Sequence, residues 1–181
     1  MPFPDLTPET APPAARRALE AVTERLGYRP AAVARLAASP HALDGFLKIS
    51  AIFDACTLDP LSREVVIMTM ATRNDCHICV AMHTAKLTSL DAEPALVAAL
   101  RDGTEAPLPD ERLESVRRFT LAVLASAGAV DDADLRDFLA YGYTEQNALE
   151  VVLGIGAYTL STLANRLTGA PVDEQLAAFA G

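Results

Sequence analysis

The sequence predicts an all-α protein made of a single domain. Segments rich in alanine and leucine, with helix start and stop signals at their ends, cover most of the 181 residues. No segment shows the alternation of apolar and polar residues that is typical of a half-buried strand. Hydrophobic residues make up 51% of the chain and charged residues 22%, which is enough apolar material for one core.

The predicted helices are separated by short connections that contain glycine, proline or polar residues. Two of them lie on either side of a polar break at 72–75. The first begins at Asp59 and Pro60, with proline in its first position, and the second runs through Leu87 with Asn74 or Asp75 as its N-cap. The other predicted helices cover 14–26, 31–38, 41–55, 94–101, 110–127, 131–140 and 144–167, with Gly169 as the last stop signal.

A proline-rich arm at residues 1–13 precedes the helical domain, which we expect to span residues 14–181. Such an arm often lies on a neighbouring subunit. The first residues show no basic region followed by an apolar stretch, so no secretory signal is visible and we expect a cytoplasmic protein. The longest apolar stretch, 151–164, is too short for a membrane helix.

The charge of the chain argues against two classes of partner. Its formal net charge is −9 and its isoelectric point is about 4.7. Nucleic acids and anionic membranes repel an acidic surface, so we expect neither as a partner. The acidic charge therefore favours a function that acts on a small molecule.

The side chains best suited to redox or nucleophilic chemistry lie within twenty residues of one another. They are Glu64, Cys76, Cys79 and His83. At about 100° and 1.5 Å per residue, the two cysteines and His83 share one helix face, with His83 about 6 Å beyond Cys79 and about 10 Å beyond Cys76. His83 can therefore assist Cys79 but not Cys76 directly. The start of the helix favours a thiolate at Cys76 by a different means, its positive dipole end.

Glu64 belongs to the preceding helix, on an apolar face that also carries Leu61, Met68 and Ala71. One continuous helix would place it about 18 Å from Cys76, so the chain must turn between them. A carboxylate on an apolar face is expected to be desolvated, which suits it to accept and return a proton.

Plainer explanations exist for each of these residues. Glu64 could be a solvated helix residue, His83 a satisfied core histidine, and the cysteines small buried hydrophobes. A structural zinc half-site is a further alternative, but a second CxxC or CxxH is missing and structural zinc requires four ligands. A thioredoxin fold is disfavoured because that scaffold needs strands.

At these residues the sequence resembles the AhpD-like branch of the carboxymuconolactone decarboxylase superfamily, and more narrowly its peroxidase-related proteins. The pattern of that branch is a glutamate, eleven residues, CxxC, three residues and a histidine, which Glu64, Cys76, Cys79 and His83 match at every spacing. The likeness covers roughly residues 40–170, including the segment 164–169. The best-known branch has a histidine immediately before the second cysteine, where this chain has Ile78, so the role of His77 is open and an exposed surface histidine is the plainer interpretation.

The resemblance implies an AhpD-like helical bundle that forms homo-oligomers and reduces organic hydroperoxides, with hydrogen peroxide as a further candidate substrate. It implies a dithiol that works without a bound cofactor or metal. Cys79 would be the peroxidatic thiol, Glu64 and His83 the proton relay, and Cys76 the more accessible resolving thiol. A lipoyl-type or thioredoxin-type dithiol would then reduce the Cys76–Cys79 disulfide.

Two other functions stay open at this point. Relatives that lack the dithiol suggest a carboxymuconolactone decarboxylase-type enzyme, although decarboxylation needs no disulfide. A redox sensor or adaptor of the oxidative stress response, whose disulfide changes its assembly, would need no turnover at all.

Overall fold

The computed structural model describes residues 3–103 and 106–180, and within these ranges the secondary structure is entirely helical. The predicted all-α, single-domain fold is therefore confirmed. Residues 1–2 of the predicted arm and residues 104–105 of the loop after the sixth helix lie outside the described residues. The elements are α1 Pro13–Leu26, α2 Ala31–Leu36, α3 Pro40–Asp54, α4 Pro60–Arg73, α5 His77–Ser89, α6 Pro94–Asp102, α7 Glu111–Ala125, α8 Asp132–Ala140, α9 Glu145–Thr168 and the 3₁₀-helix η1 Glu174–Phe179.

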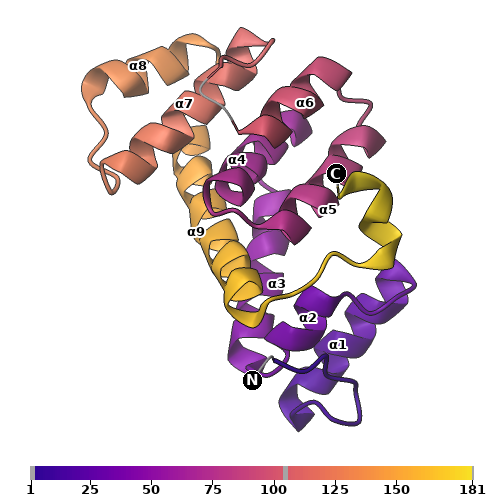
Figure 1. Ribbon diagram of the computed structural model, residues 1–181. Coiled ribbons are helices and arrows are strands. Elements are labelled where there is room, and N and C mark those ends of the chain that lie inside the picture. The colour runs from indigo at the N-terminus through magenta and orange to yellow at the C-terminus, as the bar shows by residue number, and fades with distance from the viewer. Residues whose placement is uncertain (1–2, 104–105, 181) are drawn as a thin grey trace.

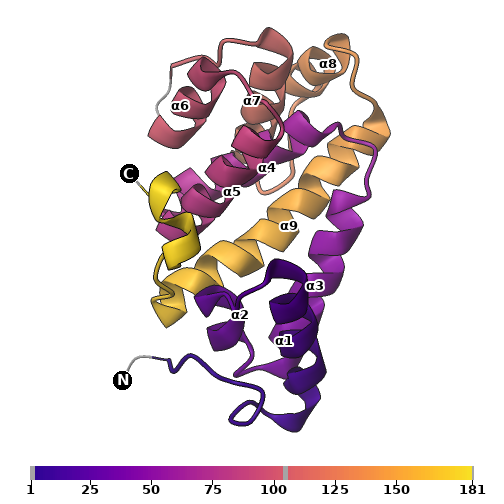
Figure 2. The same cartoon turned by 90° about the vertical axis from the view of Figure 1, so that its right-hand side faces the viewer.

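Two helices, α4 and α9, pack against most of the other helices. The buried α4 packs against α5, α6, α7 and α9, and nine of its fourteen residues are buried. The 24-residue α9 runs from α7 and α8 at one end of the molecule to α1, α2 and α3 at the other (Figures 1 and 2). Its length and composition would also fit a membrane span, but its contacts with α2, α3, α4 and α7 are those of a core helix.

The N-terminal part of the chain folds back on its own domain. α1 begins at Pro13, and before it Ala11 is buried together with Ala15 and Leu19 of α1. Asp5 accepts a hydrogen bond from Arg35 of α2 at 2.6 Å. The described part of the predicted arm, residues 3–12, therefore contacts α1 and α2.

The C-terminal segment after α9 is a feature that the sequence analysis missed. Gly169 ends α9 in the left-handed conformation, with φ 62°, as its stop signal predicts. The chain then crosses to α5, against which η1 packs (Figure 1). On the way Asp173 accepts a hydrogen bond from the backbone N–H of Ala31, and Arg101 of α6 donates to the carbonyl oxygen of Phe179.

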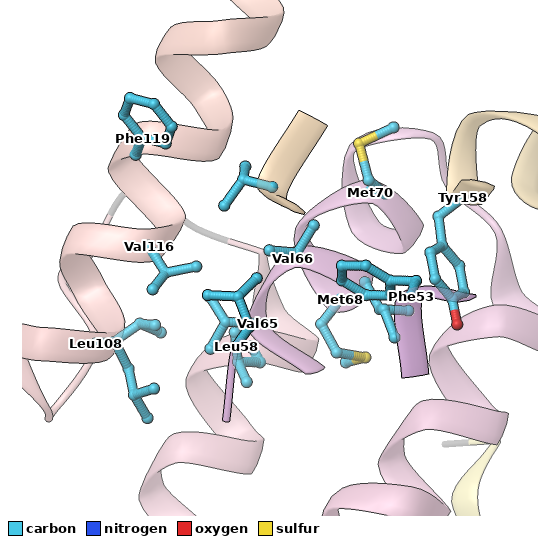
Figure 3. Close-up of a cluster of buried hydrophobic side chains, with 14 of the residues drawn as sticks. Phe53, Leu58, Val65, Val66, Met68, Met70, Leu108, Val116, Phe119 and Tyr158 are labelled. Atoms are coloured by element: carbon cyan, nitrogen blue, oxygen red, sulfur yellow. The ribbon is translucent and has the colours of Figure 1, made fainter. Parts of the chain in front are cut away.

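The core is tightest where α9 crosses α3 and α4. Phe53 and Val66 are fully buried there, next to Tyr158 (Figure 3). A Cβ added at Gly154 would lie 2.6 Å from the Phe53 ring and 3.0 Å from Val66. Only a glycine lets the helices approach this closely.

Replacing this glycine gives a test of the crossing. Gly154→Ala is expected to lower the free energy of unfolding by about 1–3 kcal/mol, because the buried Phe53 ring has to shift. The matched control is Gly45→Ala in α3, where an added Cβ meets nothing within 4 Å. That control should gain about 0.5–1 kcal/mol from helix propensity. Urea titrations at equal protein concentration measure both, and two changes of the same sign would contradict the proposed close contact.

A buried carboxylate on α9 fixes the connection between α3 and α4. Glu150 accepts hydrogen bonds from the backbone N–H groups of Thr57 and Leu58 at 3.0 and 3.1 Å, and also from Asn147 and Gln146. Burial alone would raise the pKa of Glu150, but these donors outweigh it and lower the pKa from 4.5 to about 2.

This pKa shift predicts a pH dependence of stability. The folded-state pKa lies below the unfolded value of 4.5, so the contribution of Glu150 is complete above about pH 4.5 and is lost as pH falls toward about 2. Glu150→Gln should cost about 1–3 kcal/mol at pH 7 and flatten the acid limb of a plot of unfolding free energy against pH. A variant whose acid limb matches that of the wild type would contradict this assignment.

Candidate active site

The link between α4 and α5 is a tight reversal at Asn74, Asp75 and Cys76. Asp75 adopts a left-handed conformation with φ 53°, and its N–H donates to the carbonyl oxygen of Thr72. The N–H of Cys76 donates to the carbonyl oxygen of Ala71 at 2.8 Å. This pattern of a 6→1 and a 5→2 hydrogen bond is a Schellman motif, with aspartate in the place usually taken by glycine.

The same reversal corrects one predicted detail. Cys76 is the N-cap of α5 and lies outside its first turn, whereas the sequence predicted Asn74 or Asp75 as the cap. Asn74 is instead the C-cap of α4, and Asp75 is the left-handed residue. Arg166 of α9 holds this aspartate by an ion pair and donates to its carbonyl oxygen at 2.5 Å. The hydrogen bond from Arg166 to the Asp75 carboxylate lowers the pKa of Asp75.

Cys76 and Cys79 form a disulfide across the first turn of α5. Their Cα atoms are 5.3 Å apart, a normal spacing for such a bond. Both residues are buried, with 2% of Cys76 and 4% of Cys79 exposed. The expectation that Cys76 would be the more exposed thiol is therefore not met, because the segment after Gly169 and α9 cover it.

Glu64 and His83 form a buried pair beside the disulfide. The Nδ1 atom of His83 lies 2.8 Å from a carboxylate oxygen of Glu64, and their side chains are 13% and 7% exposed. The chain turns between them as the spacing required. Since Nδ1 is occupied by the carboxylate, Nε2 is the ring nitrogen left for proton exchange.

Tyr158 of α9 completes this environment, and the sequence analysis did not find it. Its ring contacts that of His83 edge to face, with the centroids 5.4 Å apart. Burial raises the pKa of Tyr158, although a hydrogen bond with Ser50 partly opposes the shift. The phenol is therefore neutral at physiological pH.

A partly open cavity of about 380 Å³, which we call the apolar cavity, brings these groups together. Cys79, Glu64, His83 and Tyr158 all line it. The first three helices supply most of its walls, through Val22, Leu26, Val33, Leu36, Phe46 and Leu47. α1 and α2 precede residues 40–170, over which the sequence resembles the family, so the resemblance did not indicate this part of the wall.

Asn165 of α9 contacts the sulfur atoms directly and was also missed. Its side-chain N–H donates to Cys79 Sγ at 3.3 Å and to Cys76 Sγ at 3.8 Å. No spacing rule connects it with the CxxC, because 86 residues separate it from Cys79. Only the path of α9 across the end of α5 brings them together.

Cys56 and His77 lie outside the group formed by the disulfide, Glu64, His83 and Tyr158. Cys56 is a free, half-buried thiol just after α3, and burial raises its pKa. The His77 side chain is 83% exposed and faces Asp75, in agreement with the plainer interpretation of this residue. Among residues 3–103 and 106–180, no group of three or more histidine, cysteine or acidic residues could hold a metal ion.

Comparisons with known proteins identify the fold. Neither protein-family profiles nor curated protein sequences match the chain. Among solved structures, an uncharacterized peroxidase-related protein with an AhpD core from Ralstonia eutropha JMP134 superposes with a TM-score of 0.82, at 20% identity over 98% of this chain and 95% of its own. An uncharacterized peroxidase-related protein from Silicibacter sp. TM1040 gives a TM-score of 0.78, at 20% identity over 99% and 94% of the two chains.

An enzyme also shares this architecture. The debrominase Bmp8 superposes with a TM-score of 0.73, at 16% identity over 93% of this chain and 90% of its own. A further structure holds a cysteine-to-alanine variant of Bmp8 in complex with 2,3,4-tribromopyrrole. The chain thus has the AhpD-like all-α fold. More narrowly, it is similar to peroxidase-related proteins of that fold over nearly its whole length, α1 to η1 included.

Proposed function

We propose that the protein is a thiol-dependent peroxidase that reduces organic hydroperoxides. One observation carries the proposal: a redox-capable cysteine, Cys79, lines the same apolar cavity as a buried carboxylate–imidazole pair, Glu64 and His83. The AhpD-like fold of peroxidase-related proteins supports it. A cavity of about 380 Å³ with apolar walls suits a hydroperoxide with a bulky organic group.

The proposed cycle begins from the reduced dithiol. The Cys79 thiolate attacks the terminal oxygen of ROOH, the O–O bond breaks, and the leaving alkoxide takes a proton from the Glu64–His83 pair to give ROH. Cys79 is then a sulfenic acid. Cys76 attacks its sulfur, water leaves and the Cys76–Cys79 disulfide forms, which is the oxidised state of the described structure.

An external dithiol of lipoyl or thioredoxin type closes the proposed cycle by reducing the disulfide. Such exchange needs a compartment that keeps dithiols reduced, which places the proposed activity in the cytoplasm. No resident metal or cofactor is required, because both electrons pass through sulfur.

The peroxidase proposal predicts a specific pattern of variants. Consumption of cumene hydroperoxide with a lipoyl-type or thioredoxin-type reductant should fall to background in Cys79→Ser. It should fall about 10²–10⁴-fold in kcat/KM in Glu64→Gln, which cannot exchange the proton. Cys56→Ser, which changes the thiol outside the cavity, serves as the control and should keep the wild-type rate. Equal rates for the wild type and Cys79→Ser would end the proposal.

Reductive dehalogenation is a second candidate, favoured by the likeness to a debrominase and by the apolar cavity. In that reaction the dithiol gives two electrons, a carbon–bromine bond becomes carbon–hydrogen, and bromide leaves as the disulfide forms. Release of bromide from 2,3,4-tribromopyrrole by the reduced protein, without turnover of hydroperoxide, would favour this candidate over the first.

We also propose that a second copy of the chain covers an apolar stripe on α9. Five residues at successive spacings of three, eight, three and four positions lie within an arc of about 80° on one helix face, over about 27 Å. Their exposed fractions run from 37% to 76%. Burying a leucine or valine stabilises by about 1.5–3 kcal/mol, so ten half-exposed side chains from two copies can offset an association cost of about 4–15 kcal/mol. The stripe consists of Leu149, Val152, Leu160, Leu163 and Leu167.

The proposed contact through this stripe predicts that a charged substitution within it lowers the mass of the assembly in solution. The wild type should sediment as an oligomer, and Leu163→Glu should shift it toward the 19.2 kDa monomer, because a buried carboxylate opposes association. Leu121→Glu on α7, which is 42% exposed but lies off α9, is the matched control and should keep the wild-type mass. A monomeric wild type at micromolar concentration would contradict the proposal.

A further inference from the structure

We propose that Asn165 is a further catalytic residue, whose side-chain amide holds the Cys79 thiolate when the disulfide opens and so makes Cys79 the leaving sulfur and Cys76 the sulfur that the reductant attacks. The inference rests on the dithiol cycle proposed above. Its test, however, needs neither a peroxide nor a reductant protein.

Different cavities reach the two sulfurs, and Cys76 lines two of them, one of about 380 Å³ against α4 and α6 and one at the end of α9. Cys79 lines the apolar cavity. Cys76 lines a smaller cavity of about 240 Å³ at the end of α9, which we call the polar groove, together with Asp75 and Arg166. Asn165 is the residue that the linings of these two cavities share. Asn165 therefore lies between the apolar cavity, which suits an organic substrate, and the polar groove, which suits a hydrophilic reductant.

The amide is closer to Cys79 than to Cys76, by the difference between 3.3 and 3.8 Å. The dipole of α5 cannot supply this preference, because both cysteines lie at its N-terminal end, Cys76 as the N-cap and Cys79 in the first turn. A disulfide sulfur is a weak acceptor, whereas a thiolate is a strong one, so the contact strengthens when Cys79 becomes anionic. The Asn165 amide therefore stabilises the thiolate form of Cys79 more than its disulfide form.

The consequence for the reductive step follows from electron balance. A thiolate of the external dithiol attacks Cys76 Sγ from the polar groove, a new S–S bond forms, and the Cys76–Cys79 bond breaks. The electron pair of that bond goes to Cys79 Sγ, where the Asn165 amide receives the charge. The second thiol of the reductant then releases Cys76. Cys79 emerges as the thiolate that the peroxide step needs.

Charged and titratable groups on six helices and on the α4–α5 link surround the two sulfurs, and a substitution at residue 165 changes none of them. Those that line the apolar cavity are Arg25, Asp54, Glu64, His83, Lys86 and the neutral Tyr158. Asp75, His77 and Arg166 line the polar groove. Arg73, Arg101 and Asp102 line the cavity of about 380 Å³ at Cys76. A shift in the titration of Cys79 that depends on residue 165 is therefore assigned to the amide.

The test measures the Cys79 thiolate alone. With Cys56→Ser and Cys76→Ser as background, Cys79 is the single thiol, and its absorbance at 240 nm against pH gives its pKa. Asn165→Ala should raise that pKa by about one unit, a tenfold loss of thiolate below the pKa. Asn165→Asp should raise it further, because a carboxylate replaces the donor.

Asn74→Ala is the matched control. Asn74 also reaches α9 with its side-chain amide, which donates to Thr162 Oγ1 at 2.8 Å, so its loss removes a comparable contact between helices without touching sulfur. The control should leave the Cys79 titration unchanged, and thermal unfolding of each variant checks that it is folded. An unchanged Cys79 pKa in both Asn165 variants, or an equal shift in Asn74→Ala, would overturn the proposal.

Discussion

The reversal at Asp75 is the constraint on which the candidate site depends. Its left-handed backbone ends α4 and, one residue later, starts α5, so the two helices meet at a fixed angle with Cys76 at the junction. From that junction Glu64 on α4 and His83 on α5 are brought to 2.8 Å of each other. A non-glycine residue in this conformation is unfavourable by itself, and the ion pair with Arg166 ties it to α9.

The helix α9 then connects the chemistry to the core. The same helix contributes Gly154, which contacts Phe53 where α9 crosses α3 and α4. It also contributes Tyr158 and Asn165, which contact His83 and the two sulfurs. A displacement of α9 against α4 would therefore move core contacts and site contacts together. Close packing at the crossing gives the amide and the phenol their fixed positions.

Features that depend on local sequence patterns were predicted correctly. Helix signals placed the elements to within a few residues, Gly169 marked the end of α9, and the spacing from Glu64 to His83 required the turn that the structure contains. Three features escaped because they depend on contacts distant in sequence. Asn165 reaches the CxxC only through the path of α9, the C-terminal segment covers Cys76, and the left-handed Asp75 moved the N-cap of α5 by at least one residue.

The candidate reactive groups and much of the wall of the apolar cavity come from different helices. This separation bears on how proteins of this fold can differ from one another. The reactive groups come from α4, α5 and α9, whereas much of the wall comes from α1, α2 and α3. Side chains such as Val33 and Phe46 can change in size without altering the Glu64–His83 pair or the disulfide, because they lie on other helices. Under the proposed thiol chemistry, changes in the first fifty residues would alter which organic molecule fits the cavity and leave Cys79, Glu64 and His83 in place.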